Sequence, residues 1–223
     1  MADINAWKQI KDELDKSDTT LVAVSKTKPV VDIKALYDAG QPIFGENYVQ
    51  ELVEKQPQLP ADIEWHYIGH LQSNKVKYIA PFVEMIHAVD SFKLLQEINK
   101  QAAKNNRTIK VLLQLHIADE ETKFGMDDKE LIEFMDYYSA QQSDLQNVRI
   151  CGLMGMASFS DDETQVRSEF QHLNNTFKNI KTTYFLDKGG FEIRSMGMSG
   201  DYKLAIEEDS NMVRIGSLLF GSR

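Results

Sequence analysis

The chain has 223 residues, of which 42% are hydrophobic and 26% charged, and its 34 acidic and 25 basic residues give a net charge of −9. This composition is typical of a folded globular protein and argues against general binding to nucleic acid or to an anionic membrane. The single cysteine, Cys151, excludes an intrachain disulfide and a zinc site built from paired thiolates. No segment reaches the roughly 20 apolar residues of a membrane span, and no leader peptide is recognisable, so we expect a cytoplasmic protein.

Short apolar runs alternate with longer amphipathic segments along the whole chain. Residues 1–16 predict an initial amphipathic helix. Eight candidate strands follow, at residues 21–26, 43–47, 65–69, 85–89, 111–117, 149–157, 193–199 and 212–221. Several of them are apolar on both faces, which is typical of buried parallel strands. Three of the intervals between them predict helices with N-caps at Ser91, Asp128 and Asp161, and residues 202–206 predict a shorter helix.

Eight strands with seven helical intervals predict a (β/α)8 TIM barrel with an extra N-terminal helix. No shift in composition marks a boundary, so residues 1–223 are expected to form one domain. An open doubly wound sheet is the alternative, but it usually has fewer strands at this length, and no G-x-G-x-x-G motif follows the first strand. In a barrel, functional side chains lie where the strands end and the loops to the next helices begin.

The end of the first strand carries a lysine that points to amine chemistry. Lys26 is in phase with Val22 and Val24, and Pro29 stops the strand shortly afterwards. A lysine at the barrel mouth can be partly desolvated, which favours the neutral amine that forms a Schiff base. The simpler alternative is a surface lysine that extends into solvent. Lys28 lies past the apolar run and is the weaker candidate.

The ends of the last two strands predict a phosphate site. Ser199 and Gly200 stand before the short helix predicted at 202–206, and Gly216 and Ser217 follow the eighth strand. Glycine allows close approach to the backbone, serine adds a donor, and these two loops are where barrels commonly hold phosphate. The alternative is that these residues only form turns and caps.

Three other strand ends leave their alternatives open. Glu46 and Asn47 lie near the barrel mouth and could orient a ligand, although Asn47 could instead only cap the following helix. His66 and His70 are four apart but lack the H-E-x-x-H pattern of a metal site, so no metal is expected. The methionine-rich run at 152–157 is most often core, although it could also form an apolar wall for a flat ring.

Read together, these strand ends resemble one known family. The resemblance rests on six ordered blocks, at residues 23–29, 44–48, 65–75, 152–154, 195–201 and 213–217. They are similar to the pyridoxal phosphate homeostasis proteins, which in turn are similar to the barrel domain of alanine racemase. Because the blocks run in order over nearly the whole chain, the resemblance implies the same barrel for this chain.

The resemblance also implies a cofactor and the residues that hold it. Lys26 would form the internal aldimine with pyridoxal 5′-phosphate, and Arg214 would face the pyridine nitrogen. The phosphate would be held by Ser199, Gly200, Gly216 and Ser217, with Asn47 beside the ring. Two positions depart from the family pattern. Ser217 replaces the more usual threonine and keeps the hydroxyl, whereas His116 stands where asparagine is more typical, so its role is open. Lys123 is a possible second contact or a surface lysine.

The expected function is that of a carrier in vitamin B6 homeostasis that binds the cofactor without turnover. A protonated Arg214 beside the ring would make the ring a poorer electron sink than one paired with a carboxylate. The β-rich second domain that supplies a catalytic tyrosine in alanine racemases is not expected here, which favours a monomer. Apo-enzymes that use the cofactor are the expected acceptors. The alternatives are an amino-acid racemase with another base (Lys28, Tyr48, His66 or His70) and a sugar-phosphate aldolase-like barrel that uses Lys26.

Overall fold

Eight parallel strands form a closed barrel in the computed structural model of this chain, which describes residues 1–120, 124–186 and 189–221. The strands follow one another in chain order around the barrel, and β8 pairs with β1 to close it. Their bounds are β1 Thr20–Val24, β2 Ile43–Glu46, β3 Glu64–Tyr67, β4 Met85–Val89, β5 Ile109–Gln114, β6 Val148–Met154, β7 Ile193–Met198 and β8 Met212–Ile215. The predicted barrel is therefore confirmed.

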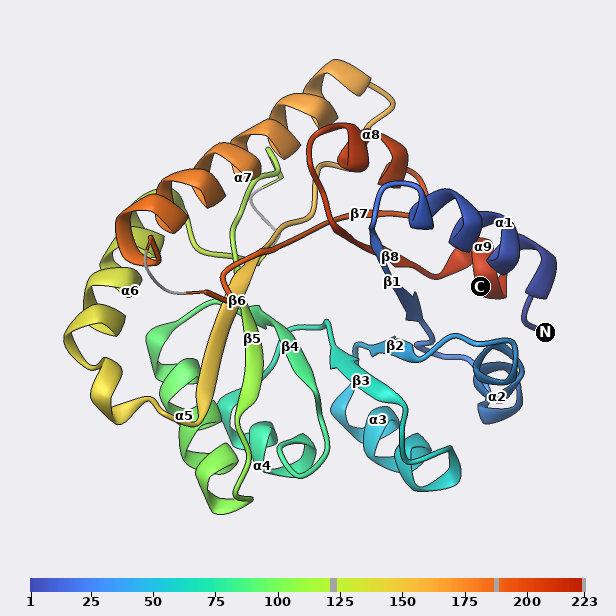
Figure 1. The fold of residues 1–223 in the computed structure, drawn as a ribbon, viewed down its shortest axis with the longest axis horizontal. Helices are drawn as coiled ribbons and strands as arrows, with labels where there is room; N and C mark the ends of the chain where they lie inside the picture. Colours follow the sequence, from blue (N-terminus) through green and yellow to red (C-terminus); the bar gives the residue numbers. More distant parts are fainter. Residues whose placement is uncertain (121–123, 187–188, 222–223) are drawn as a thin grey trace.

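Helices cover the outside of the barrel (Figure 1). Their bounds are α1 Ile4–Asp15, α2 Val30–Asp38, α3 Val49–Lys55, α4 Val76–Ile79, α5 Phe92–Lys104, α6 Asp128–Ala140, α7 Glu163–Tyr184, α8 Tyr202–Glu207 and α9 Ser217–Phe220, with short 3-10 turns η1 Gln56–Gln58, η2 Ser73–Lys75 and η3 Gln142–Asp144. Within the described residues, no helix combines the length and apolar character needed to cross a membrane.

The extra N-terminal helix α1 packs beside the C-terminal helix α9. Asp3 caps α1 by accepting a hydrogen bond from the backbone N–H of Ala6, and Trp7, Ile10 and Leu14 form its buried stripe. The backbone N–H of Asp3 donates to the carbonyl of Leu219 in α9 at 2.8 Å. Figure 1 shows the two chain ends on the same side of the barrel as a result.

Successive side chains along a strand point alternately to an outer core, which lies between the strands and the helices, and to the barrel interior. In β1, Leu21 and Ala23 belong to the large apolar core shared with the helices, whereas Val22 belongs to a second cluster. Val22 is the register partner of Arg214 in β8, so both side chains lie on the same face of the sheet. The second cluster contains Val22, Met85, Ala88, Leu112, Cys151, Met154 and Met212. The interior is thus packed by side chains, as expected for a barrel of this size.

The eighth predicted strand is wrong at its C-terminal end. β8 ends at Ile215, and residues 217–220 form α9, because a short apolar run does not by itself distinguish a strand from a buried helical turn. The first strand ends at Val24, which leaves Lys26 in a turn rather than at the last strand position. The ends of the other strands differ from the prediction by no more than three residues.

Two of the predicted helix starts are displaced by one residue. Ser91 is an N-cap as predicted. The N-cap of α6 is Asp127 rather than Asp128, because the Asp127 side chain forms a capping box with the third helical residue. The N-cap of α7 is Asp162 rather than Asp161, since its carboxylate accepts from two N–H groups of the first turn. The short helix predicted at 202–206 is confirmed as α8.

Candidate functional site

All seven residues that the resemblance assigns to the cofactor line a single cavity of about 380 Å³. They come from the C-terminal ends of β1, β2, β7 and β8 and are Lys26, Asn47, Ser199, Gly200, Arg214, Gly216 and Ser217. The closed barrel brings them together because the C-terminal ends of its parallel strands all meet at one face. The structure thus places the predicted amine and the predicted phosphate loops around the same space.

The main chain around Lys26 is held by residues of α3. Thr27 adopts a left-handed conformation, with φ of 64°, so the chain turns sharply directly after the lysine. The backbone N–H of Thr27 donates to Glu51 at 2.6 Å, and the Lys55 ammonium donates to the carbonyl of Ser25 at 2.8 Å. The backbone on both sides of Lys26 is therefore fixed from outside the barrel.

A buried ion cluster lies behind this turn. The Lys55 ammonium is 2.7 Å from Oε1 of Glu46 and 2.6 Å from Oε1 of Glu51, and Oε1 of Glu46 also accepts from the Ser25 hydroxyl. Burial raises the pKa of Glu46, and the hydrogen bonds from Lys55 and Ser25 oppose that shift. Glu46 Oε2 is buried without a hydrogen-bond partner. Glu46 therefore supports the Lys26 turn and does not face the cavity.

The Arg214 guanidinium is fixed inside the barrel by three hydrogen bonds. Nη1 donates to the carbonyl oxygen and the hydroxyl of Ser195, each at 2.7 Å, and Nη2 donates to the carbonyl of Gly155 at 2.9 Å. Arg214 is only 4% exposed, and burial lowers its pKa to about 10. It therefore stays protonated at neutral pH and provides a fixed cation in the cavity wall.

Two histidines extend this network across the barrel interior. Nδ1 of His87 is 3.2 Å from the Ser195 hydroxyl, and its Nε2 is 3.0 Å from Nδ1 of His66. Burial lowers the pKa of His66 to about 3 and that of His87 well below its usual range, so both are neutral at pH 7. Because Ser195 accepts from Arg214, its own proton is available to His87, and an unbroken chain of hydrogen bonds runs from Arg214 to His66.

The loops after β7 and β8 form the opposite end of the cavity. The backbone N–H of Gly216 donates to the Ser199 hydroxyl at 3.3 Å, which brings the two loops into contact. Gly197, with φ of 96°, is required where β7 meets α8, because a Cβ there would lie 2.7 Å from Cβ of Ala205. Helix α9 starts at Ser217, and the first N–H groups of a helix have no acceptor within it.

The cavity is apolar along its sides and positively charged around its rim. Ile68, Met156 and Met198 contribute apolar side chains, so the methionine-rich run supplies a wall as well as core. The described lining residues include three cations, Lys26, Lys28 and Arg214, against one carboxylate, Asp201. That carboxylate accepts from the backbone N–H of Met198 at 2.6 Å. A local positive field is thus present in a chain whose net charge is −9.

Several other sequence candidates lie elsewhere. His66 is inside the barrel, whereas the His70 ring stacks on Phe124 and lies 3.4 Å from Asp90. His116 is 3.0 Å from the carbonyl of Glu120 through its Nε2. Cys151 is buried, as predicted, and burial raises its pKa. Lys123 is outside the described residues. Among the described residues, no group of three or more His, Cys, Asp or Glu side chains is arranged to hold a metal ion.

Sequence reasoning missed the residues that support the site from behind. Lys55 and Glu51 hold the Lys26 turn, and His87 and Ser195 hold Arg214. No sequence signal marked Lys55, because a lysine in the last turn of a short helix is usually exposed.

Comparison with known proteins agrees with this site and fold. Residues 4–223 match the family described as alanine racemase, N-terminal domain. The pyridoxal phosphate homeostasis protein of Aquifex aeolicus is 40% identical over 204 residues, which cover 91% of this chain and 86% of that protein. The Escherichia coli K12 protein of the same name is 37% identical over 208 residues, which cover 92% of this chain and 86% of that protein.

Solved structures show the same barrel. PipY of Synechococcus elongatus, determined with PLP bound, has a TM-score of 0.86 and 32% identity, with 98% of this chain and 99% of PipY covered. Alanine racemase of Bartonella henselae, at 17% identity and a TM-score of 0.72, shares the fold over 97% of this chain and 61% of the racemase. Fold and site thus define a barrel of the alanine racemase N-terminal type. Within that class, the chain belongs to the family of pyridoxal phosphate homeostasis proteins.

Proposed function

We propose that this protein binds pyridoxal 5′-phosphate covalently through Lys26 and serves in intracellular vitamin B6 homeostasis, without catalytic turnover. The observation that carries the proposal is the single cavity that joins the Lys26 end of β1 to the two loops after β7 and β8. The relatives at 36–41% identity bear the corresponding name, and the PipY structure holds the same cofactor.

The charges of the cavity fit a phosphorylated aldehyde. A phosphate ester carries roughly −1.5 to −2 charges at neutral pH, and three cations line the cavity against one carboxylate. Gly200 faces open space, so its backbone is accessible to a ligand. Ser199, Gly216 and Ser217 supply further hydroxyl and N–H donors at this end.

The ring position is supported by two further observations. Asn47 lines the cavity and its Oδ1 is buried without a hydrogen-bond partner, so a donor on a bound ring that reached this atom would satisfy it. Met156 and Met198 provide apolar surface for a flat ring. When bound, the cofactor supplies an aldehyde that condenses with a primary amine and releases water. Lys26 is the lysine that we assign to this bond.

Two features of the site support storage rather than turnover. Arg214 stays protonated, with a pKa of about 10, and a protonated arginine disfavours protonation of a ring nitrogen that faces it. His66, one of the candidate bases, is hydrogen-bonded to His87 inside the barrel and is neutral and desolvated. The other histidine candidate, His70, stacks on Phe124 outside the cavity. We therefore propose a monomeric, single-domain cytosolic carrier that passes the cofactor to apo-enzymes.

The first experiment tests the lysine assignment. Purified protein incubated with pyridoxal 5′-phosphate is expected to absorb in the visible range, and borohydride reduction should fix the cofactor to Lys26, as mapped by peptide mass spectrometry. Lys26→Ala removes the only amine assigned to the bond, so the visible band should fall to background. Lys28→Met is the matched control, because Lys28 lines the same cavity, and its band should persist.

A visible band retained in Lys26→Ala, or reduction that fixes the cofactor to another lysine, would show the assignment to be wrong. Turnover is tested separately by incubating the loaded protein with single L-amino acids in deuterated water. We expect no more deuterium at Cα than with free cofactor. Saturable incorporation at enzymatic rates would instead identify a racemase or a related enzyme.

A further inference from the structure

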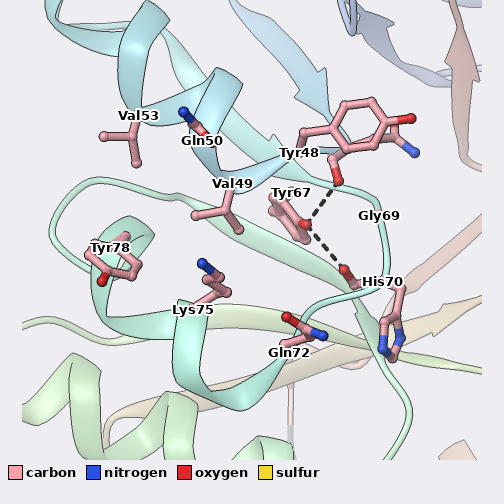
Figure 2. Close-up of a pocket in the computed structure, with 11 residues that line it drawn as sticks. Tyr48, Val49, Gln50, Val53, Tyr67, Gly69, His70, Gln72, Lys75 and Tyr78 are labelled. Atoms are coloured by element: carbon pink, nitrogen blue, oxygen red, sulfur yellow. Dashed lines mark hydrogen bonds between the residues drawn. The ribbon is translucent and has the colours of Figure 1, made fainter.

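A second pocket lies beside the cofactor cavity and is larger, with a volume of about 710 Å³. It is bounded on one side by the first turn of α3 and on the other by the segment from Gly69 to Tyr78 that includes η2 and the start of α4 (Figure 2). Asn47 lines both spaces, so the two are direct neighbours. We refer to this second space as the side pocket.

The base of the side pocket is rigid. The hydroxyl of Tyr67 lies 2.9 Å from the carbonyl oxygen of Asn47 and 3.1 Å from that of His70, so one buried donor joins both sides (Figure 2). At Gly69 a Cβ would lie 2.3 Å from the carbonyl oxygen of Asn47, so the two backbones pack in direct contact. Burial raises the pKa of Tyr67 to about 12, which keeps its proton in place. The pocket is therefore formed before any ligand binds.

The walls expose apolar and aromatic surface that a folded protein usually buries. Tyr48 is 52% exposed, Tyr78 48% and Val53 37%, and all three line the pocket together with Val49. Ligand sites of roughly 300–1,000 Å³ typically combine such surface with a few polar groups that fix orientation. The size and the surface both suit a small organic molecule with an aromatic ring.

The polar groups of the side pocket favour an anion. The Lys75 ammonium extends toward Val49 and Tyr78 in Figure 2, and its Nζ is 5.8 Å from the centre of the Tyr78 ring. Among the described residues that line the pocket, none carries a carboxylate, although acidic residues outnumber basic ones in the chain by 34 to 25. Nδ1 of His70, which also lines the pocket, lies 3.4 Å from the carboxylate of Asp90, so Lys75 is the side chain that we assign to an anionic ligand.

We infer that the side pocket binds a small aromatic carboxylate. Its ring lies against Val53 and Tyr78, and its carboxylate pairs with Lys75. The pairing is a charge-assisted hydrogen bond from an exposed lysine, so it orients the carboxylate while the apolar wall supplies most of the contact. This site lies outside the cofactor cavity, and its occupation does not depend on the covalent bond at Lys26.

The test uses the full chain and indole-3-acetate as the probe, followed by calorimetry and by amide shifts in two-dimensional NMR. Saturable binding is expected, with shifts concentrated in α3 and in residues 69–78. The neutral analogue indole-3-acetamide should bind about two- to fivefold more weakly, because it cannot form the exposed ion pair with Lys75. The same loss is expected when indole-3-acetate is titrated into Lys75→Gln.

Lys77→Gln is the matched control. Lys77 also lies over the Tyr78 ring, at 5.0 Å, but it does not line the pocket, so the affinity should be unchanged. The inference is overturned if binding is not saturable, if acid and amide bind equally, or if Lys77→Gln weakens binding as much as Lys75→Gln. Displacement of the probe by pyridoxal 5′-phosphate would place the probe in the cofactor cavity and would also overturn it. None of these outcomes affects the assignment of Lys26.

Discussion

Lys26 and Arg214 line the same cavity, but their supports come from different parts of the barrel. Around Lys26, Lys55 and Glu51 hold the main chain on either side of the lysine. Around Arg214, Ser195 and a backbone carbonyl hold the guanidinium itself. Under the proposed function, a cation that faces a bound ring has to keep its direction, and the three hydrogen bonds of Arg214 meet that requirement.

The two supports also differ in charge and in place. The Lys26 turn is held from outside the barrel by an ion cluster in which Lys55 contacts two carboxylates. Arg214 is held from inside the barrel by a network whose histidines are neutral. Removing Lys55 from the first support leaves a charge buried without its partner, whereas removing a histidine from the second leaves a neutral polar group. The energetic consequences should therefore differ in size and in pH dependence.

The largest effect is expected from Lys55→Met. This change leaves the carboxylate of Glu46, which is fully buried, without its cation. Breaking a buried pair from one side typically costs about 3–5 kcal/mol. We expect the free energy of unfolding, measured by urea denaturation, to fall by about that amount. Cofactor affinity should also fall, because the turn that carries Lys26 loses one of its anchors.

The double variant Lys55→Met/Glu46→Leu tests whether the loss of stability comes from the unpaired carboxylate of Glu46 or from lost packing. It removes both charges from the same buried volume, and such replacements are often close to neutral in stability. The double variant should therefore be more stable than Lys55→Met alone. If the two variants are equally destabilised, the cost does not come from the unpaired carboxylate of Glu46.

The same comparison shows what the sequence could and could not predict. Lys26 and the loops at Ser199 and Gly216 were predictable because each follows an apolar strand directly, and barrel geometry brings strand ends together. The buried position of Lys55 was not predictable, because it depends on how α3 packs against β1 and β2. The inward position of His87 could not be predicted either. The pairing of β4 with β5 shifts register within the strand, so simple alternation does not tell which face of the sheet carries its side chain.

The histidine network predicts an acid-sensitive stability. The pKa of His66 in the folded protein is about 3 and that of His87 is also well below its usual range, whereas both are near 6.5 in an unfolded chain. Below about pH 6.5 the unfolded state therefore binds more protons, and stability falls as the pH falls. The expected slope is about 1.4 kcal/mol per pH unit for each histidine.

Urea denaturation at pH 7.5 and pH 5.5 measures this slope. The variant His66→Asn lowers stability at both pH values, because it interrupts the network, but it should show a smaller loss between them than the unaltered protein. An equal loss in both proteins would mean that His66 does not titrate with the depressed pKa. Glu46 shifts stability in the opposite sense, since its pKa is raised and its contribution declines as the pH rises. The acid sensitivity is therefore assigned to the interior network and not to the ion cluster.

The smallest effect concerns Lys28, the third cation in the cavity wall. Its ammonium donates to the carbonyl oxygens of Phe220 and Gly221, at 3.0 and 3.1 Å, and so ties the turn after β1 to the end of α9. Lys28→Met removes both hydrogen bonds from a partly exposed site, so we expect a loss of about 1 kcal/mol in the free energy of unfolding. The matched control is Lys34→Met, which removes an exposed ion pair with Asp38 and a 6.0 Å contact of the ammonium with the Tyr37 ring, and should cost about 0.5 kcal/mol or less. If both variants lose the same stability, the Lys28 contact to α9 adds nothing beyond a surface charge. A larger loss in Lys28→Met would show that this cation is held through its side chain, as Arg214 is.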